Sequence, residues 1–134
     1  MSRKLFVNLP VKDLKKSVAF FTELGFVFNP AFTDETATCM VLNEGAYVML
    51  LVESKFKEFT SKSIIDTAGN VEVITSFSVD SRQAVDELVT KALALGSKPA
   101  KDPLDLGFMY NRSFLDPDGH IWEAFWMDPN AIPQ

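Results

Sequence analysis

The stretch that decides the fold runs from Leu5 to Gly25 and reads LFVNLPVKDLKKSVAFFTELG. Apolar residues occupy every second position at its start, namely Leu5, Val7, Leu9 and Val11. This alternation is typical of a β-strand with one face on a core. Asp13 then stands where a helix N-cap belongs, and Gly25 stands where a C-terminal cap belongs. Between these caps apolar residues recur at helical spacing, at Leu14, Val18, Phe21 and Leu24. The stretch therefore predicts a strand followed by an amphipathic helix.

The same pattern returns in residues 72–96, which read EVITSFSVDSRQAVDELVTKALALG. A strand is predicted over 72–79, Asp80 and Gln83 have the spacing of a capping box, and Gly96 ends the helix. Three further strands are predicted after each helix, at 26–32, 37–43 and 47–53, and at 97–100, 108–115 and 120–127. A turn over 116–119, with the sequence DPDG, joins the last two strands. Each half is therefore strand, helix and three strands, an internal repeat with a period of about 65 to 70 residues.

This order predicts an α+β protein of two βαβββ modules in a single domain. Two helices cannot cover both faces of about eight strands, so we expect a curved mixed sheet with helices on its convex side and a concave cup on the other. The expected boundaries are module 1 at about 1–53, a connector at about 54–70, module 2 at about 71–127 and a C-terminal tail at about 128–134. The composition of the connector suits a short helix and linker, or a flap over a pocket.

Composition excludes several classes of protein. The net charge is −5 and the sequence pI is about 4.8, and no cluster of Lys and Arg forms the basic patch that nucleic-acid binding requires. No apolar run approaches the length of a membrane span, and the N-terminus lacks the apolar segment of a signal peptide. Cys39 is the single cysteine, so an intrachain disulfide is impossible and a reducing compartment is favoured. We therefore expect a cytoplasmic protein that binds neither nucleic acid nor membrane.

Two motifs carry a resemblance to a known superfamily. Val11-Lys12-Asp13-Leu14, followed by Ser17 to Phe21 and Leu24-Gly25-Phe26, resembles the opening of vicinal-oxygen-chelate proteins. The segment from Asp116 to Glu123, DPDGHIWE, resembles their closing hairpin. This superfamily includes glyoxalases, bleomycin resistance proteins and dioxygenases, and the wording here is closest to small bacterial proteins described as predicted lactoylglutathione lyases. The resemblance implies the two-module fold, a small-molecule ligand or substrate and a homodimer.

The resemblance also implies where a metal would bind, because metal-dependent relatives hold one divalent ion with two residues from each module. The corresponding positions here are Phe6, Met49, Val73 or Ile74, and Glu123. Only Glu123 offers a ligand suited to a hard cation, since Phe, Val and Ile have no lone pair and a Met thioether matches such ions poorly. A shift of register brings in Asn8 or Glu72. We therefore expect no metal or other cofactor, with a divalent metal as the less favoured alternative.

Three polar residues have both a functional and a structural interpretation. Glu123 is the candidate catalytic residue, although the DPDG turn predicts that Arg112 lies opposite it as a cross-strand ion pair. His120 is the lone histidine, and its place beside the turn favours an exposed residue over a catalytic one. Cys39, between apolar strand residues, is interpreted as a buried and inert thiol.

The residues expected to line the cup and bind the ligand are Phe6, Asn8, Met49, Tyr110, Arg112, Glu123 and Phe125. An aromatic cup in an acidic protein favours a metal-free binding protein for a small cationic or aromatic ligand. The alternatives are a metal-dependent enzyme similar to lactoylglutathione lyase, and a metal-free isomerase or epimerase with Glu123 as base.

Overall fold

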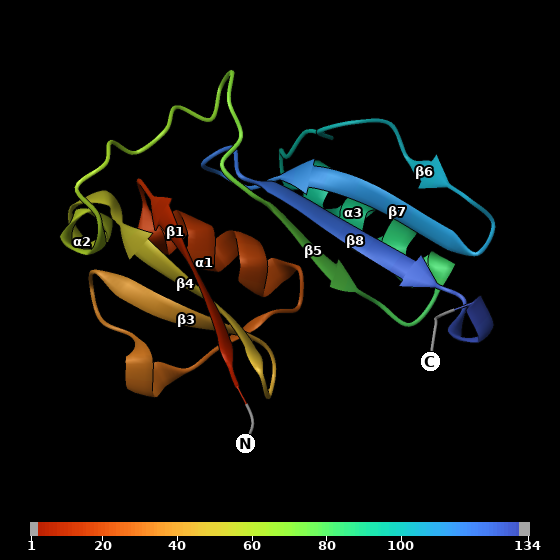
Figure 1. The fold of residues 1–134 in the computed structure, drawn as a ribbon, viewed down its shortest axis with the longest axis horizontal. Helices are drawn as coiled ribbons and strands as arrows, with labels where there is room; N and C mark the ends of the chain where they lie inside the picture. The colour runs from red at the N-terminus through yellow and green to blue at the C-terminus, as the bar shows by residue number, and fades with distance from the viewer. Residues whose placement is uncertain (1–2, 132–134) are drawn as a thin grey trace. The chain divides into compact units, whose positions relative to one another are not determined.

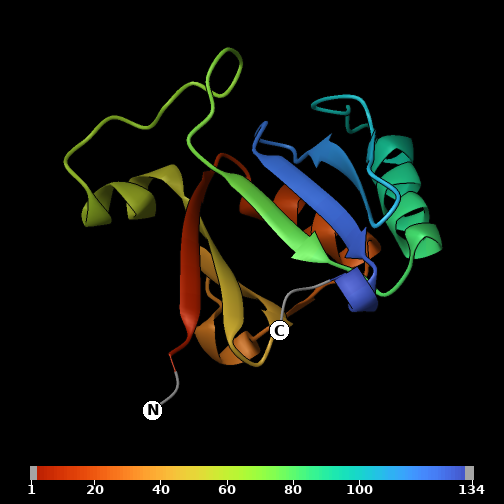
Figure 2. The same ribbon diagram turned by 45° about the vertical axis from the view of Figure 1, so that its right-hand side comes forward.

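A computed structural model describes residues 3–131 of the chain, in two compact units that divide between Asp66 and Thr67. Each unit is one βαβββ module, and Figures 1 and 2 show the first module in red to yellow and the second in green to blue. The expectations for the first two residues and for the end of the C-terminal tail, residues 132–134, lie outside the described residues. The structure confirms the predicted α+β class, and the eight strands form two four-stranded mixed sheets, one in each module.

The elements of module 1 are β1 (Leu5–Val11), α1 (Leu14–Glu23), β2 (Val27–Phe28), β3 (Ala37–Asn43) and β4 (Ala46–Val52). Its sheet has the order β1-β4-β3-β2, in which β1 and β4 run parallel and the other pairs run antiparallel. The parallel pair is the consequence of the crossover through α1. The hairpin between β3 and β4 forms where Asn43 to Ala46 predicts a turn.

Module 1 follows the opening stretch of the sequence closely. The Asp13 side chain accepts a hydrogen bond from the Lys16 backbone amide at 3.1 Å, so Asp13 is the N-cap of α1. Gly25 has a φ of +97°, the left-handed conformation that follows many helices and that glycine adopts without strain. The strand predicted over 26–32 ends early, because the Asn29 side chain caps a short 3₁₀ helix (Pro30–Phe32) and Pro30 has no amide hydrogen for a strand ladder.

The segment between the modules contains a short helix and an irregular connector. After β4 the chain forms α2 (Glu53–Phe56) and a 3₁₀ helix (Lys57–Phe59), and residues 60–73 have no helix or strand. No helix in the described part of the chain is long and apolar enough to cross a membrane.

The elements of module 2 are β5 (Ile74–Ser78), α3 (Arg82–Ala94), β6 (Leu104–Asp105), β7 (Met109–Leu115) and β8 (Ile121–Met127), followed by a 3₁₀ helix (Pro129–Ala131). The sheet order β5-β8-β7-β6 repeats that of module 1. The strand predicted over 97–100 is wrong: the chain there makes one backbone bond to β7, from the Leu115 amide to the Lys98 carbonyl, and the ladder resumes only at Leu104.

The N-cap of α3 is Ser81, and the prediction of Asp80 is wrong. The Ser81 hydroxyl accepts a hydrogen bond from the Ala84 amide at 3.0 Å. Asp80 and Ser81 are both good cap residues, so the sequence alone does not distinguish them. Aligning the two caps, Ser81 with Asp13, makes Ile74 rather than Val73 the counterpart of Phe6.

Candidate functional site

The two faces of the module 2 sheet have different environments. Tyr110 and Arg112 of β7 both contact Asp86 of α3, so this face of the sheet packs on the helix. Because side chains alternate along a strand and paired residues share a face, the odd-numbered residues of β7 and β8 and the even-numbered residues of β5 lie on the opposite face. We call it the Glu123 face, and its residues used below are Ser76, Asn111, Ser113, Glu123 and Phe125.

Glu123 is held in place on this face from two sides. Ser76, its partner on β5, donates a hydrogen bond from its hydroxyl to Oε1 at 2.8 Å. Lys101 places its Nζ 3.4 Å from Oε2. The Glu123 side chain is 16% exposed, whereas the Lys101 side chain is 44% exposed. The carboxylate is therefore a mostly buried, anchored group, and the cation beside it extends into solvent.

The predicted pairing of Arg112 with Glu123 is wrong. Ser113 lies opposite Glu123, and Arg112 lies opposite Ala124 on the other face. Arg112 forms an ion pair with Asp86 at 3.0 Å, and the Tyr110 hydroxyl donates to the same carboxylate at 2.6 Å. These bonds from Tyr110 and Arg112 lower the pKa of the Asp86 carboxyl. Tyr110 and Arg112 thus hold α3 on the sheet and do not share a face with Glu123 and Phe125.

The hairpin loop explains this error of one residue. The Gly119 amide donates to the Asp116 carbonyl, Gly119 has a φ of +81°, and the Asp116 amide donates to the His120 carbonyl. The loop is therefore a three-residue connection with a left-handed glycine, and the first regular strand pair is Leu115 with Ile121. The prediction that Arg112 lies opposite Glu123 requires a loop that is one residue shorter. Since side chains alternate with a period of two, a slip of one residue moves Arg112 to the opposite face.

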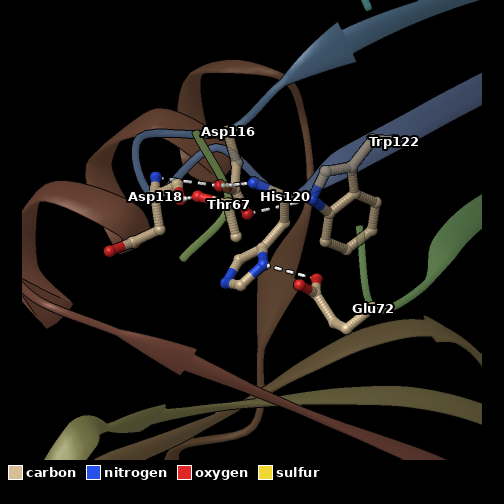
Figure 3. Close-up of polar contacts among 6 residues, drawn as sticks. All are labelled: Thr67, Glu72, Asp116, Asp118, His120 and Trp122. Atoms are coloured by element: carbon tan, nitrogen blue, oxygen red, sulfur yellow. Dashed lines mark hydrogen bonds and ion pairs between the residues drawn. The ribbon is translucent and has the colours of Figure 1, made fainter. Parts of the chain in front are cut away.

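A buried polar cluster closes the base of this hairpin (Figure 3). Asp116 accepts hydrogen bonds from the amides of Asp118 and His120 on Oδ1, at 2.9 and 3.0 Å, and from the Trp122 indole on Oδ2 at 3.0 Å. Burial raises the pKa of Asp116, and the nearby His120 and these hydrogen bonds partly oppose the rise. The cluster fixes the loop conformation from which the register of Glu123 follows.

His120 belongs to this cluster, and the prediction that it is an exposed turn residue is wrong. Its side chain is 3% exposed, and Nδ1 lies 2.9 Å from Oε1 of Glu72. Thr67 adds a second tie, because its hydroxyl donates to the Asp118 carbonyl at 2.6 Å. No local sequence pattern predicts these contacts, since Glu72 and Thr67 lie 48 and 51 residues from their partners.

Module 1 brings three of the predicted ligand-binding residues onto one face of its sheet. Phe6 pairs with Tyr47, and Asn8 pairs with Met49. The Phe6 and Tyr47 rings stack with centroids 4.8 Å apart, and Phe6 is 50% exposed. Cys39 of β3 pairs with Met49 of β4. Cys39 is buried, as predicted, and this burial raises the pKa of its thiol. This face offers an aromatic surface and no carboxylate on the paired positions named here.

Comparison with known proteins agrees with the two-module fold. Residues 3–43 match the family model described as bleomycin resistance protein-like N-terminal. A hypothetical protein from S. aureus is 27% identical, with a TM-score of 0.78 over 94% of each chain. A glyoxalase/bleomycin resistance protein/dioxygenase family enzyme from Burkholderia phytofirmans PsJN is 20% identical, with a TM-score of 0.76 over 94% of this chain and 99% of that one.

A lactoylglutathione lyase from Agrobacterium tumefaciens is 16% identical, with a TM-score of 0.69 over 98% of each chain. The search of curated proteins found no match. The chain therefore has the fold of the glyoxalase/bleomycin resistance protein/dioxygenase proteins, which is the fold of the vicinal-oxygen-chelate superfamily. At these identities the likeness to solved structures establishes the fold, and it does not assign the activities of those proteins to this chain.

The metal site of this superfamily can be tested against the donors that the chain offers. Asn8 pairs with Met49 as Ser76 pairs with Glu123, and Asn8 and Ser76 each lie five residues before a helix cap. Met49 is thus the counterpart of Glu123 in module 1. Phe6, Ile74 and Met49 provide no hard donor, which leaves Glu123 alone at the four positions.

The surroundings of Glu123 also oppose a cation bound through it. The Lys101 ammonium already lies beside its carboxylate, and Glu72, the alternative donor, is engaged by His120. No group of three or more His, Cys, Asp or Glu side chains gathers within residues 3–131 in a way that could hold a metal ion. The described donor set therefore does not fit a divalent metal, and a metal-free protein remains our expectation.

Proposed function

We propose that this vicinal-oxygen-chelate protein binds a small molecule on the Glu123 face without a metal ion, and that the ligand carries a cationic group next to an aromatic one. The observation that carries the proposal is the anchored carboxylate of Glu123, bonded by Ser76 and accompanied by the more exposed ammonium of Lys101. An anchored, mostly buried carboxylate beside a more exposed cation is suited to exchange that cation for one supplied by a ligand.

Lys101 supports the choice of a cationic ligand. Its Nζ lies 3.4 Å from Glu123, which means that this face accommodates an ammonium group. A long lysine side chain loses considerable rotamer entropy when it is held in one place, so a salt bridge at 44% exposure contributes little. A ligand ammonium that replaces Lys101 therefore gives up little of the native stability.

Phe125 supports the choice of an aromatic group. It lies two residues from Glu123 on β8 and on the same face, so a ligand bound to the carboxylate reaches its ring. Module 1 offers a second aromatic surface in the stacked Phe6 and Tyr47 rings, next to Asn8 and Met49. Aromatic rings bind organic cations through their negative faces as well as by apolar contact.

The two enzymatic alternatives have less support. A metal-dependent lyase needs several hard donors, and Glu123 is the only such donor at the corresponding positions. An isomerase or epimerase with Glu123 as base needs a substrate carbon near the carboxylate, whose two oxygens are already engaged by Ser76 and Lys101. The catalytic role of Glu123 therefore stays a prediction. The homodimer implied by the resemblance is part of the proposal, and light scattering on the purified chain tests it.

Titration with aromatic cations, followed by NMR chemical shifts, tests the proposed function. The probes are benzylamine, 2-phenylethylamine and tryptamine, each compared with the corresponding alcohol. We expect the amines to shift signals of β5, β7 and β8 and to bind more tightly than the alcohols. Glu123→Gln should lose this preference. Glu87→Gln, which removes the same charge from the exposed side of α3, should retain it. Equal binding of amines and alcohols, or preference unaltered in Glu123→Gln, contradicts the proposal.

Lys101 provides a second, opposite change. Lys101→Met removes the competing ammonium and should raise the affinity for the amines roughly threefold to tenfold, the effect of one modest ion pair. Lys98→Met removes an exposed lysine three residues away and should leave the affinity unchanged. A fall in amine affinity in Lys101→Met would instead show that Lys101 helps to bind the ligand.

A further inference from the structure

Asn111 on the Glu123 face has a buried side-chain oxygen without a hydrogen-bond partner. Asn111 is 6% exposed, and its Oδ1 has no partner among the described residues. It lies on β7 directly opposite Phe125 of β8, and Leu104 of β6 flanks it on the other side. The residue is next to Glu123 on the sheet, because Ser113, two residues further along β7, is the partner of Glu123.

An unpaired buried carbonyl is unusual and costly. More than nine-tenths of buried polar groups in proteins are hydrogen-bonded, and each exception calls for an explanation. Three other polar residues of this face have partners: Ser76 donates to Glu123, Ser113 accepts from the amides of Ala100 and Lys101, and Glu123 contacts Lys101. A leucine at position 111 would fill a similar volume without this cost, so an asparagine there provides something that packing does not need.

Lys101 spans the pair formed by Ser113 and Glu123, which is the next pair on this face to that of Asn111 and Phe125. Its backbone amide donates to the Ser113 hydroxyl on β7, while its Nζ reaches Glu123 on β8. The lysine stem therefore crosses this part of the face. A ligand ammonium that replaces the Lys101 ammonium at Glu123 therefore lies near the carbonyl of Asn111, which is one pair away on the same face.

We propose that Asn111 is a specificity-determining residue, whose Oδ1 accepts a hydrogen bond from an N–H group of the ligand. This inference rests on the proposed function and narrows its ligand class. Glu123 recognises positive charge and Phe125 recognises an aromatic ring, but Asn111 distinguishes cations by their hydrogens. The ligand is accordingly a primary or secondary aromatic ammonium, and a quaternary ammonium, which has no N–H to donate, binds more weakly.

A comparison of 2-phenylethylamine with its N,N,N-trimethyl derivative tests the inference by NMR titration. Wild type should bind the primary amine roughly tenfold or more tightly, the value of a hydrogen bond from a charged donor to a buried acceptor. Asn111→Leu should bind both probes with similar affinity. Asn111→Ala serves as a second variant with a smaller side chain. Gln83→Leu, which removes an amide from the exposed side of α3, should retain the wild-type preference.

Stability of the free protein gives an independent measurement. If Oδ1 is unpaired without ligand, Asn111→Leu should raise the midpoint of thermal unfolding by about a few degrees. A lowered midpoint in Asn111→Leu means that the amide is already satisfied in the free protein, and overturns the inference. A preference for the primary amine that survives in both Asn111 variants also overturns it while leaving the proposed function intact. Failure of wild type to bind either probe overturns both.

Discussion

Removing the carboxylate of Asp116 should destabilise the protein far more than an average substitution. Asp116 is 6% exposed and accepts three hydrogen bonds, from two backbone amides and from the indole of Trp122, which is fully buried. In Asp116→Ala the indole N–H and the buried His120 amide lose their acceptor, at about 1–3 kcal/mol each. Water can replace the bond to the Asp118 amide, which lies closer to the surface. We therefore expect a loss of about 3–5 kcal/mol, a large part of the stability of a typical domain.

A double-mutant cycle isolates the bond between Asp116 and Trp122. Trp122→Phe removes the indole donor and leaves some unfilled volume, and Asp116→Ala removes the acceptor. The coupling energy between the two substitutions should be about 1–3 kcal/mol. Asp116→Ala leaves a buried indole N–H without its acceptor when Trp122 is present, and this penalty disappears when residue 122 is phenylalanine. Equilibrium unfolding in urea, followed by circular dichroism for wild type and the three variants, measures it. A coupling energy near zero, or a loss below about 1 kcal/mol in Asp116→Ala, would refute the assignment of this cluster as the support of the hairpin.

Three further outcomes concern module 2. Ser81→Ala should cost about 1 kcal/mol because it removes the cap of α3, whereas Asp80→Ala should cost under about 0.5 kcal/mol, and urea unfolding distinguishes them. Gly119→Ala should cost about 1–3 kcal/mol, since an alanine at a φ of +81° is strained and its Cβ would lie 2.5 Å from the Thr67 hydroxyl; an unchanged urea midpoint would show that the loop has another conformation. Burial raises the pKa of Asp116, so the folded state takes up a proton at a higher pH than the unfolded state. The folded protein is therefore less stable with Asp116 ionised, at neutral pH, than with Asp116 protonated. The free energy of unfolding of wild type, relative to that of Asp116→Asn, should therefore rise as the pH falls towards the ordinary pKa of a carboxyl. A difference between the two proteins that does not change with pH would contradict this assignment.

The sequence predicts those parts of the fold that depend on local rules. The cap at Asp13 and the left-handed Gly25 follow from the chemistry of helix ends, and β1 and β3 have the predicted bounds because their patterns are long and clear. The same rules do not choose between neighbouring residues of equal quality. The cap of α3 is at Ser81 rather than Asp80, and this difference of one residue also decides that Ile74 corresponds to Phe6.

The candidate site is harder to predict because its register depends on one loop. The DPDG turn was recognised, but Gly119 lies inside the loop and His120 is the residue that pairs with Asp116, and this shift of one residue changes the partner of Glu123 from Arg112 to Ser113. Arg112 and Tyr110 consequently contact α3, while Asn111, which sequence reasoning missed, shares a face with Glu123 and Phe125. The alternation of side chains along β7 and β8 shows which residues share a face with Glu123 only when the loop length, and so the register of the two strands, is known.

The two ties from Thr67 and Glu72 to the final hairpin have a practical consequence for dissecting the chain. They attach residues 67–72, at the end of the connector, to module 2. The part of the connector that a protease can cleave should therefore end near Asp66. A fragment meant to carry the second half alone should therefore start at Thr67. One started at residue 71 would lack the hydroxyl that reaches the Asp118 carbonyl and would lose part of what keeps its own loop in shape.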